Sequence, residues 1–314
     1  MNASDVVSVY LSARRAMGVR LDREERYLRQ FVREVGNRPL ADITAATVGA
    51  FLRGRGAPTA TWSVKRSSLA GLYRYAIARG FVAVSPLPEY RPKMSPPQTP
   101  YVYSTAELQR LLDATVVLKH PASRLQAMTY RTLLLLLYGT GLRVGEAIAL
   151  TVSDVDLPRR LITVRDTKFY KTRLVPIGPR LSERLAAYLD RRRLLTLPEG
   201  EGSSFFCSRT GHGLNYPDVN RIFHRIRSAA RIGIPVGERR PPRLHDLRHA
   251  AAVHRVLSWY RAGKDVQRLL HPLATYLGHR NIRSTQRYLQ MTPELLQEAS
   301  RRFAQYAGLE VSHD

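Results

Sequence analysis

Apolar residues recur at helical spacing through roughly the first 85 positions of the chain. In the segment 21–35 they fall on one helical face, formed by Leu21, Tyr27, Leu28, Phe31, Val32 and Val35. Thr44 is a suitable N-terminal cap for a third helix. A further amphipathic helix is indicated by Trp62, Leu69, Leu72, Tyr73 and Ile77. The pattern predicts a helical domain over residues 1–84.

A proline-rich segment follows this domain. The stretch SPLPEYRPKMSPPQTPY, residues 85–101, contains six prolines, and proline blocks helix continuation and favours extended backbone. We therefore predict a stiff linker over residues 85–103. The sequence STAE at 104–107 is a capping-box pattern, which predicts the start of a helix and of a second domain, residues 104–314.

The second domain reads as mostly helical with one β-prone region. Two such runs, Leu161–Val164 and Arg173–Ile177, flank the stretch DTKFYK, which we interpret as a turn with Lys168 at or near its tip. Further helices are predicted at Leu181–Arg193, Asn220–Ala230 and Asp246–Arg261, and after Thr292 with Pro293 at the first helical position. The predicted fold class is mainly α with a small antiparallel β-sheet.

The charge of the chain narrows the possible partners. Fifty basic residues face 25 acidic ones, which gives a net charge of +25. A surface this basic attracts polyanions and predicts salt-dependent binding of DNA or RNA. A ribosome-associated or membrane-surface protein is the alternative. In the first domain Arg53, Arg55, Lys65, Arg66 and Arg74 lie opposite the apolar stripes, where they either contact a DNA backbone or form ordinary solvated surface.

Several features bear on where the protein works. The longest apolar run, Leu133–Leu137, is too short to span a bilayer, and the start MNASDVVSVY has no basic region followed by an apolar stretch. The single cysteine, Cys207, cannot form an internal disulfide. These observations predict a cytoplasmic protein without a membrane partner.

Three short motifs contain residues that suit phosphate chemistry. Arg143 follows a Gly-Thr-Gly turn at the predicted start of a helix, where its planar fork could face an anion. His245 and Arg248 share a helical face, although His224 and Arg227 repeat the same spacing. Taken alone, each of these residues is better explained as solvated surface.

The third motif lies near the end of the chain. It contains His279 and, nine residues later, Tyr288, with Arg280, Arg283 and Arg287 close by. Positive charges of this kind favour a phenolate near a phosphate. A half-buried core tyrosine is the alternative interpretation.

The order of the motifs is more specific than any one of them. GTGLRVGE, a lysine hairpin ending in RLVPIG, HDLRH, and LGH with a tyrosine nine residues on follow one another along the chain. The set resembles the catalytic domain of tyrosine recombinases, the phage-integrase and Xer-type enzymes, over residues ~104–305. The preceding helical segment is similar to the core-binding domain of that family. LATYLGH is similar to a transposon-associated branch.

The resemblance implies a role for each motif residue. Arg143 and Arg248 would clamp the scissile phosphate, with His245 as a proton-transfer residue and His279 supporting the phosphate. Tyr288 would be the nucleophile. Lys168 would protonate the leaving 5′ oxygen, because lysine can release a proton in a crowded cationic site and arginine practically cannot. Two further residues would not react: Lys171 and the orienting Glu146.

The family implies a site-specific recombinase that acts through a 3′-phosphotyrosine and a Holliday junction, in integration, excision or transposition of a mobile element. Tyrosine attack conserves the bond energy, so neither a metal nor another cofactor is expected. The expected partners are double-stranded DNA with specific recombination sites, three further copies of the chain in a tetramer on DNA, and accessory proteins or sister recombinases. The alternatives are Xer-type chromosome dimer resolution, a type IB topoisomerase-like enzyme, and a non-enzymatic DNA-binding module.

Overall fold

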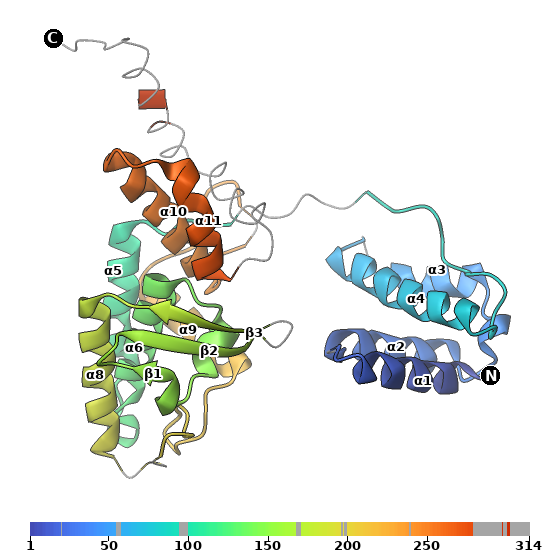
Figure 1. Ribbon diagram of the computed structural model, residues 1–314, viewed down its shortest axis with the longest axis horizontal. Helices are drawn as coiled ribbons and strands as arrows, with labels where there is room; N and C mark the ends of the chain where they lie inside the picture. The colour runs from blue at the N-terminus through green and yellow to red at the C-terminus, as the bar shows by residue number, and fades with distance from the viewer. Residues whose placement is uncertain are drawn as a thin grey trace. The chain divides into compact units, whose positions relative to one another are not determined.

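The chain folds into two compact units, Met1–Gln98 and Thr99–Asp314, in a computed structural model. The structure describes residues 1–19, 21–54, 58–93, 100–167, 171–195, 197, 200–238, 240–278, 297 and 300–301, with only the backbone at 166, 167 and 171. Among these residues no helix is both long and apolar enough to cross a membrane. Figure 1 shows a helical first unit and a second unit that also contains a sheet.

The first unit is built from helices whose apolar faces meet in one core. Its elements are α1 (Ala3–Ala16), α2 (Asp22–Val35), the 3-10 helix η1 (Leu40–Asp42), α3 (Ala45–Arg53) and α4 (Ala60–Ala78). The Thr44 side chain accepts a hydrogen bond from the backbone N–H of Thr47, which confirms the predicted cap of α3. Phe31 of α2 packs edge-to-face against Phe51 of α3, with 5.1 Å between ring centroids.

Two residues of α4 differ from the predicted arrangement. Ile77, assigned to the apolar stripe, is exposed. Lys65, assigned to the solvated face, is only 7 % exposed. Its ammonium donates to the carbonyl of Phe51 at 2.9 Å and lies 4.0 Å from the centre of the Phe51 ring. The charge is buried because it meets a carbonyl in the last turn of α3, where a helix end favours a cation.

The core of the second unit is built around helix α6 (Gln126–Thr140). Its helices are α5 (Thr105–Ala114), η2 (Thr115–Leu118), η3 (Pro121–Ser123), α6 (Gln126–Thr140), α7 (Val144–Ile148), η4 (Val152–Asp154), α8 (Pro179–Arg193), α9 (Tyr216–Ala229), α10 (Asp246–Arg261) and α11 (Val266–Leu277). The leucines of α6 at 133, 134, 136 and 137 are all buried, as expected for a helix that is apolar on several faces. Both α8 and α10 pack against α6.

A small antiparallel sheet of order β1-β2-β3 completes this unit. The strands are β1 (Val155–Asp156), β2 (Leu161–Thr167) and β3 (Lys171–Pro176). Ile162 pairs with Val175 and both are buried, which fixes the register of the hairpin. The mainly helical fold class with a small antiparallel sheet is thus confirmed. The strands extend further toward the turn than predicted, so that Lys171 belongs to β3.

The helix predictions were confirmed in part. Ser104 and Glu107 form the reciprocal capping box predicted for α5. Helix α9 begins four positions earlier than predicted, with Asn215 as its cap. Helix α11 was not predicted; Pro272 lies inside it and removes one backbone donor from the helix. The helix predicted after Thr292 begins outside the described residues.

Both ends of the segment predicted as a linker are packed. Leu87 contacts the core of the first unit, and the Arg66 side chain donates to the carbonyl of Pro88. At the other end Tyr103 is fully buried in the second unit, and its hydroxyl donates to the carbonyl of Arg243 at 3.1 Å. The described ends of this segment therefore each belong to the core of the unit beside them.

We expect Lys65→Ala to lower the free energy of unfolding of the first unit by about 1–3 kcal/mol, because a buried carbonyl loses its donor. Arg74→Ala, an exposed change on the same helix, should stay within about 0.5 kcal/mol of the wild type. Denaturant unfolding of the three proteins tests this. If Lys65→Ala weakened DNA binding without changing stability, the residue would have the surface role first assigned to it.

Candidate active site

Arg143 lies at the junction between α6 and α7. Helix α6 ends at Gly141, which has a left-handed φ of +64°, and Arg143 is the residue that precedes the first turn of α7. A Cβ at Gly141 would be strained by this φ and would lie 2.5 Å from a methyl group of Leu277, so glycine is favoured in this turn. The Arg143 side chain is 44 % exposed, which leaves it accessible to a ligand.

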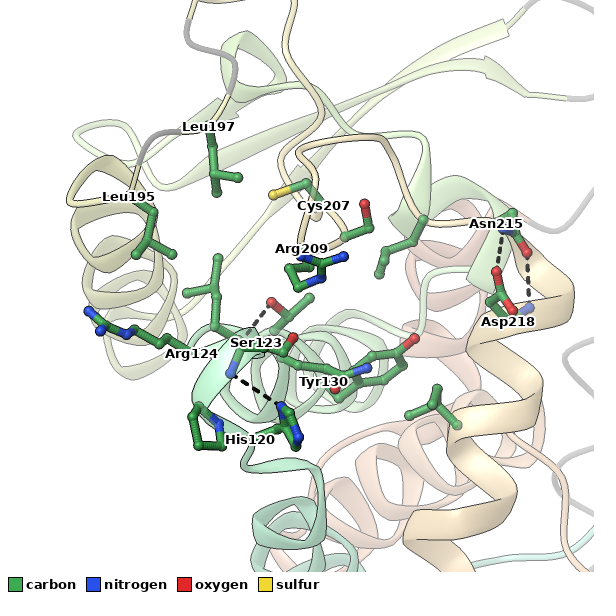
Figure 2. A pocket seen from close by; sticks show the side chains of 18 of the residues that line it. His120, Ser123, Arg124, Tyr130, Leu195, Leu197, Cys207, Arg209, Asn215 and Asp218 are labelled. Atoms are coloured by element: carbon green, nitrogen blue, oxygen red, sulfur yellow. Dashed lines mark hydrogen bonds between the residues drawn. The ribbon is translucent and has the colours of Figure 1, made fainter.

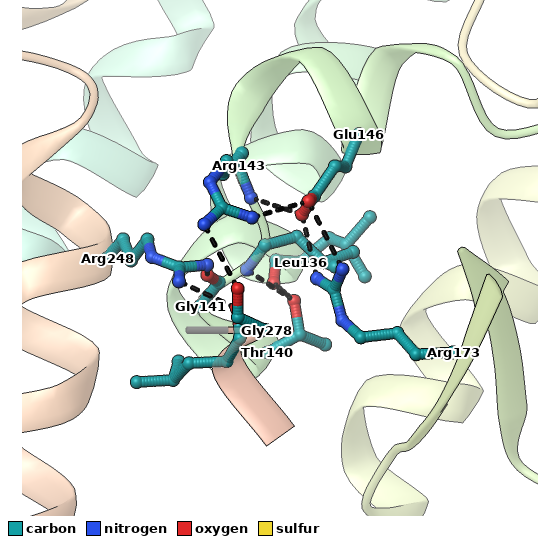
Figure 3. Close-up of polar contacts among 10 residues, drawn as sticks. Leu136, Thr140, Gly141, Arg143, Glu146, Arg173, Arg248 and Gly278 are labelled. Carbon is teal, nitrogen blue, oxygen red and sulfur yellow. Dashed lines mark hydrogen bonds and ion pairs between the residues drawn. The ribbon is translucent and has the colours of Figure 1, made fainter. Parts of the chain in front are cut away.

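The carboxylate of Glu146 fixes the orientation of Arg143. It accepts from the Arg143 backbone N–H at 3.0 Å and from Nη1 at 2.8 Å. The same two oxygens accept from Arg173 of β3 at 3.2 and 2.8 Å (Figure 3). Burial raises the pKa of Glu146, but the hydrogen bonds and charges of Arg173 and Arg143 outweigh it and lower the pKa to about 2. The orienting role predicted for Glu146 is consistent with this geometry.

Arg248 is almost completely buried, 3 % exposed, in the first turn of α10. Its guanidinium donates to the carbonyls of Gly141 at 2.5 Å and Leu277 at 2.6 Å, which lie at the ends of α6 and α11. Arg143 donates in turn to the carbonyl of Gly278 at 3.2 Å. The two arginines, far apart in the sequence, are therefore both hydrogen-bonded to the end of α11, and Arg248 also binds the end of α6 (Figure 3).

His245 precedes α10, and its ring packs edge-to-face against that of His249 with 5.1 Å between centroids. Although the His245 residue is partly exposed, desolvation by the surrounding protein lowers its pKa, and the charge of Arg248 lowers it further. Burial also lowers the pKa of His249, to about 4, with His245 contributing. A neutral His245 at physiological pH can accept a proton.

A second buried carboxylate anchors the start of α10. Asp246, 2 % exposed, accepts from the backbone N–H of Arg243 at 2.7 Å and from its guanidinium at 2.8 Å. Sequence reasoning missed Asp246, His249 and Arg173. The spacing of four between His245 and His249 was an available signal for one of them, because such residues are neighbours on a helix.

The structure also separates the two His-x-x-Arg patterns. In α9 the Arg227 side chain is buried and donates to the carbonyl of Pro242 at 2.9 Å, while His224 lies near Asn220. Arg227 therefore has a structural role, whereas His224 is exposed. Three predicted site residues, Lys168, His279 and Tyr288, lie outside the described residues. Of their surroundings, the hairpin strands β2 and β3 and Gly278, which precedes His279, are described.

A cavity among the described residues lies away from these arginines. About 860 Å³ in volume, it is bordered by the start of α6, by Cys207 and by the start of α9, and contains none of the predicted site residues (Figure 2). The arginine cluster lies at the opposite end of α6. A site that receives a phosphate of a large, extended ligand does not need an enclosed cavity.

The arrangement of Arg143, Arg248 and His245 suits one kind of chemistry. Two guanidinium groups in fixed positions stabilise the charge of a phosphodiester, and a neutral histidine nearby can transfer a proton. Together with a strongly basic chain, this defines a class of protein that acts on the backbone of a nucleic acid.

Comparison with known proteins gives the family. The phage integrase family matches residues 103–294. The Sinorhizobium fredii protein named integrase/recombinase y4rB is 36% identical over 304 residues, covering 94% of this chain and 95% of that protein. Tyrosine recombinase XerC of Oceanobacillus iheyensis is 31% identical over 276 residues, covering 86% and 83%. A lambda integrase tetramer bound to a Holliday junction has a similar fold, with a TM-score of 0.68 at 20% identity, covering 92% of this chain and 77% of that one.

The chain therefore belongs to the phage integrase family. It is a tyrosine recombinase, an enzyme that breaks and rejoins DNA strands.

We expect Glu146→Gln to destabilise the protein at pH 7 by at most about 3 kcal/mol, a bound that follows from the lowered pKa. A carboxylate with a folded-state pKa near 2 stabilises the fold above its ordinary pKa of 4.5, and this contribution is lost as the pH falls toward 2. The stability difference between the two proteins should therefore shrink below pH 4.5. Denaturant unfolding between pH 7 and pH 3 measures it, and a constant difference would contradict the assignment.

We expect Gly278→Ala to reduce both stability and strand cleavage. Gly278 has a φ of +70°, and an added Cβ would lie 2.9 Å from the guanidinium carbon of Arg173. The backbone strain alone costs about 1 kcal/mol. Gly145→Ala, where an added Cβ meets no atom within 4 Å, is the matched control in α7. Equal unfolding free energies and cleavage rates for the two variants would contradict this account of Gly278.

Proposed function

We propose that this recombinase cleaves DNA by attack of Tyr288 on a phosphodiester, giving a 3′-phosphotyrosine, and exchanges strands through a Holliday junction. The observation that carries the proposal is the convergence of Arg143 and Arg248 on the end of α11, where they donate to the carbonyls of Gly278 and Leu277. Because these contacts fix both cations before DNA binds, little reorganisation is needed when charge develops on the phosphate.

The steps of the cleavage reaction follow from the side-chain chemistry. The Tyr288 hydroxyl loses its proton as its oxygen bonds to phosphorus, and the bond from phosphorus to the 5′ oxygen breaks. His245, which its lowered pKa keeps neutral beforehand, takes up the proton of Tyr288 as the proton-transfer residue. Lys168 gives a proton to the leaving 5′ oxygen, and His279 supports the phosphate. The reverse sequence of steps rejoins the strands.

The proposed assembly is a tetramer in the cytoplasm that holds two DNA sites. Two protomers bind each site, and each protomer binds through both of its units. The similarity to lambda integrase, seen as a tetramer bound to a Holliday junction, supports this arrangement. The similarity to y4rB, named as an integrase/recombinase, supports a role in moving a mobile element. Resolution of chromosome dimers is the second candidate, supported by the 31% identity to XerC.

The first test uses DNA that flanks the protein's own gene, with the wild type, Tyr288→Phe and Tyr306→Phe compared side by side. We expect the wild type and Tyr306→Phe to leave protein on a 3′ phosphate at one discrete position, and Tyr288→Phe to leave none. Sequencing of the DNA ends in the covalent adducts locates the site.

Three results would count against the proposal. A covalent adduct that survives Tyr288→Phe would show that another residue is the nucleophile. Catalytic relaxation of any supercoiled plasmid, without a specific site, would favour the topoisomerase-like reaction. Tight DNA binding without an adduct on any tested DNA, and without relaxation, would favour a binding module.

A further inference from the structure

Arg173 is placed to act on the catalytic arginine through a shared carboxylate. It lies in β3, opposite Val164 of β2, and Lys168 falls between these two strands in the sequence. Its side chain is only 15 % exposed, so it does not present a free cation to a ligand. Its Nε is buried and has no hydrogen-bond partner among the described residues. The orientation of the guanidinium therefore depends on its two Nη groups, and both of them donate to Glu146.

The contact with Glu146 is forked and it is shared. Nη1 and Nη2 of Arg173 each donate to a different carboxylate oxygen, and the same oxygens accept from Nη1 and the backbone N–H of Arg143. Bidentate pairs of this kind fix geometry as well as charge. Movement of Arg173 would therefore move the carboxylate that orients Arg143.

The charges in this cluster have a direct consequence for phosphate binding. Two guanidinium cations and one carboxylate leave a net charge of +1. Without Arg173, the Glu146 carboxylate would face Arg143 alone and neutralise it. A neutralised pair attracts a phosphodiester far less than a cation does, because Coulomb energy scales with charge. Arg173 thus allows Arg143 to keep both its orienting carboxylate and its positive charge.

Arg173 also touches the other group that holds Arg143. A Cβ on Gly278 would lie 2.9 Å from Cζ and Nη1 of Arg173, so the guanidinium packs directly against this glycine. The carbonyl of Gly278 accepts from Arg143. The two groups that bind the Arg143 side chain, the Glu146 carboxylate and the Gly278 carbonyl, therefore belong to residues that contact Arg173.

We propose that Arg173 is a positioning residue that sets the orientation and the net positive charge of Arg143 through Glu146. It joins the hairpin that contains Lys168 to the arginine cluster. The inference rests on the proposed function, in which Arg143 stabilises the charge on the scissile phosphate.

The test measures single-turnover formation of the covalent adduct at saturating DNA, together with DNA affinity. We expect Arg173→Met to slow adduct formation about 10- to 100-fold, the range for a misplaced catalytic group, with affinity within about threefold. Arg173→Lys should recover part of the rate, because it restores the charge. The double variant Arg173→Met with Glu146→Gln should form the adduct faster than Arg173→Met alone, because it no longer has the uncompensated carboxylate of Glu146.

Arg165→Met is the matched control. Arg165 lies on the same hairpin and pairs with Asp154, another buried carboxylate, at 2.5 Å, but neither residue contacts Arg143. This variant should cleave at the wild-type rate. If Arg173 had a purely structural role, Arg173→Met would lower the melting temperature, and adding Glu146→Gln would not restore the rate of adduct formation. That result would overturn the inference. Equal rates for Arg173→Met and Arg165→Met would also overturn it.

A second readout separates the inference from the proposed reaction. Orthovanadate, a phosphate-like anion, should raise the melting temperature of the wild type and of Arg165→Met. It should raise that of Arg173→Met by less. In the double variant the larger increase should return. If the wild type forms no adduct while this pattern holds, the proposed reaction fails and the inference stands. If the wild type forms the adduct while Arg173→Met matches Arg165→Met in both assays, the inference alone fails. Neither adduct nor stabilisation would overturn both.

Discussion

The carbonyl groups at the ends of α6 and α11 are the constraint on which the site depends. The last carbonyls of a helix have no partner within it, and in a buried location they need donors from elsewhere. Arg248 supplies donors to Gly141 and Leu277, and Arg143 supplies one to Gly278. The same contacts that satisfy the backbone hold two cations together. Stability and phosphate chemistry therefore use one set of hydrogen bonds.

Two carboxylates orient arginines near the site in a chain with 50 basic and 25 acidic residues. Glu146 and Asp246 both lie in the first turn of a helix, where the helix dipole favours a negative charge. Each binds an arginine through both the backbone N–H and the guanidinium. They fix the ends of the segments that contain Arg143 and Arg248 without adding a free negative charge beside a phosphate. In this way a strongly cationic site remains ordered.

Local sequence signals predicted local structure well. Caps at Thr44 and Ser104 were recognisable because a capping side chain bonds to backbone only a few residues away. The hairpin was predicted from two β-prone runs on either side of a turn sequence, whereas β1, with two residues, was too short to recognise. Helix α11 was not predicted. It contains Pro272, so tertiary packing outweighs the loss of one helical hydrogen bond there. Lys65 was assigned to the surface because helical spacing shows which face a residue lies on. It does not show that another helix places the Phe51 carbonyl within hydrogen-bond distance.

By itself, the sequence determined the kind of chemistry and the residues that are candidates for it, because each motif carries its side-chain types in a fixed local order. Arg143, His245 and Arg248 could be named from that order. Only the tertiary structure decided how these residues are held. Arg143 reaches Gly278 across 135 positions, Arg248 reaches Gly141 across 107, and Arg173 reaches Glu146 across 27. No helical or strand periodicity links such positions, since they meet only when α6, α10, α11 and the hairpin pack together.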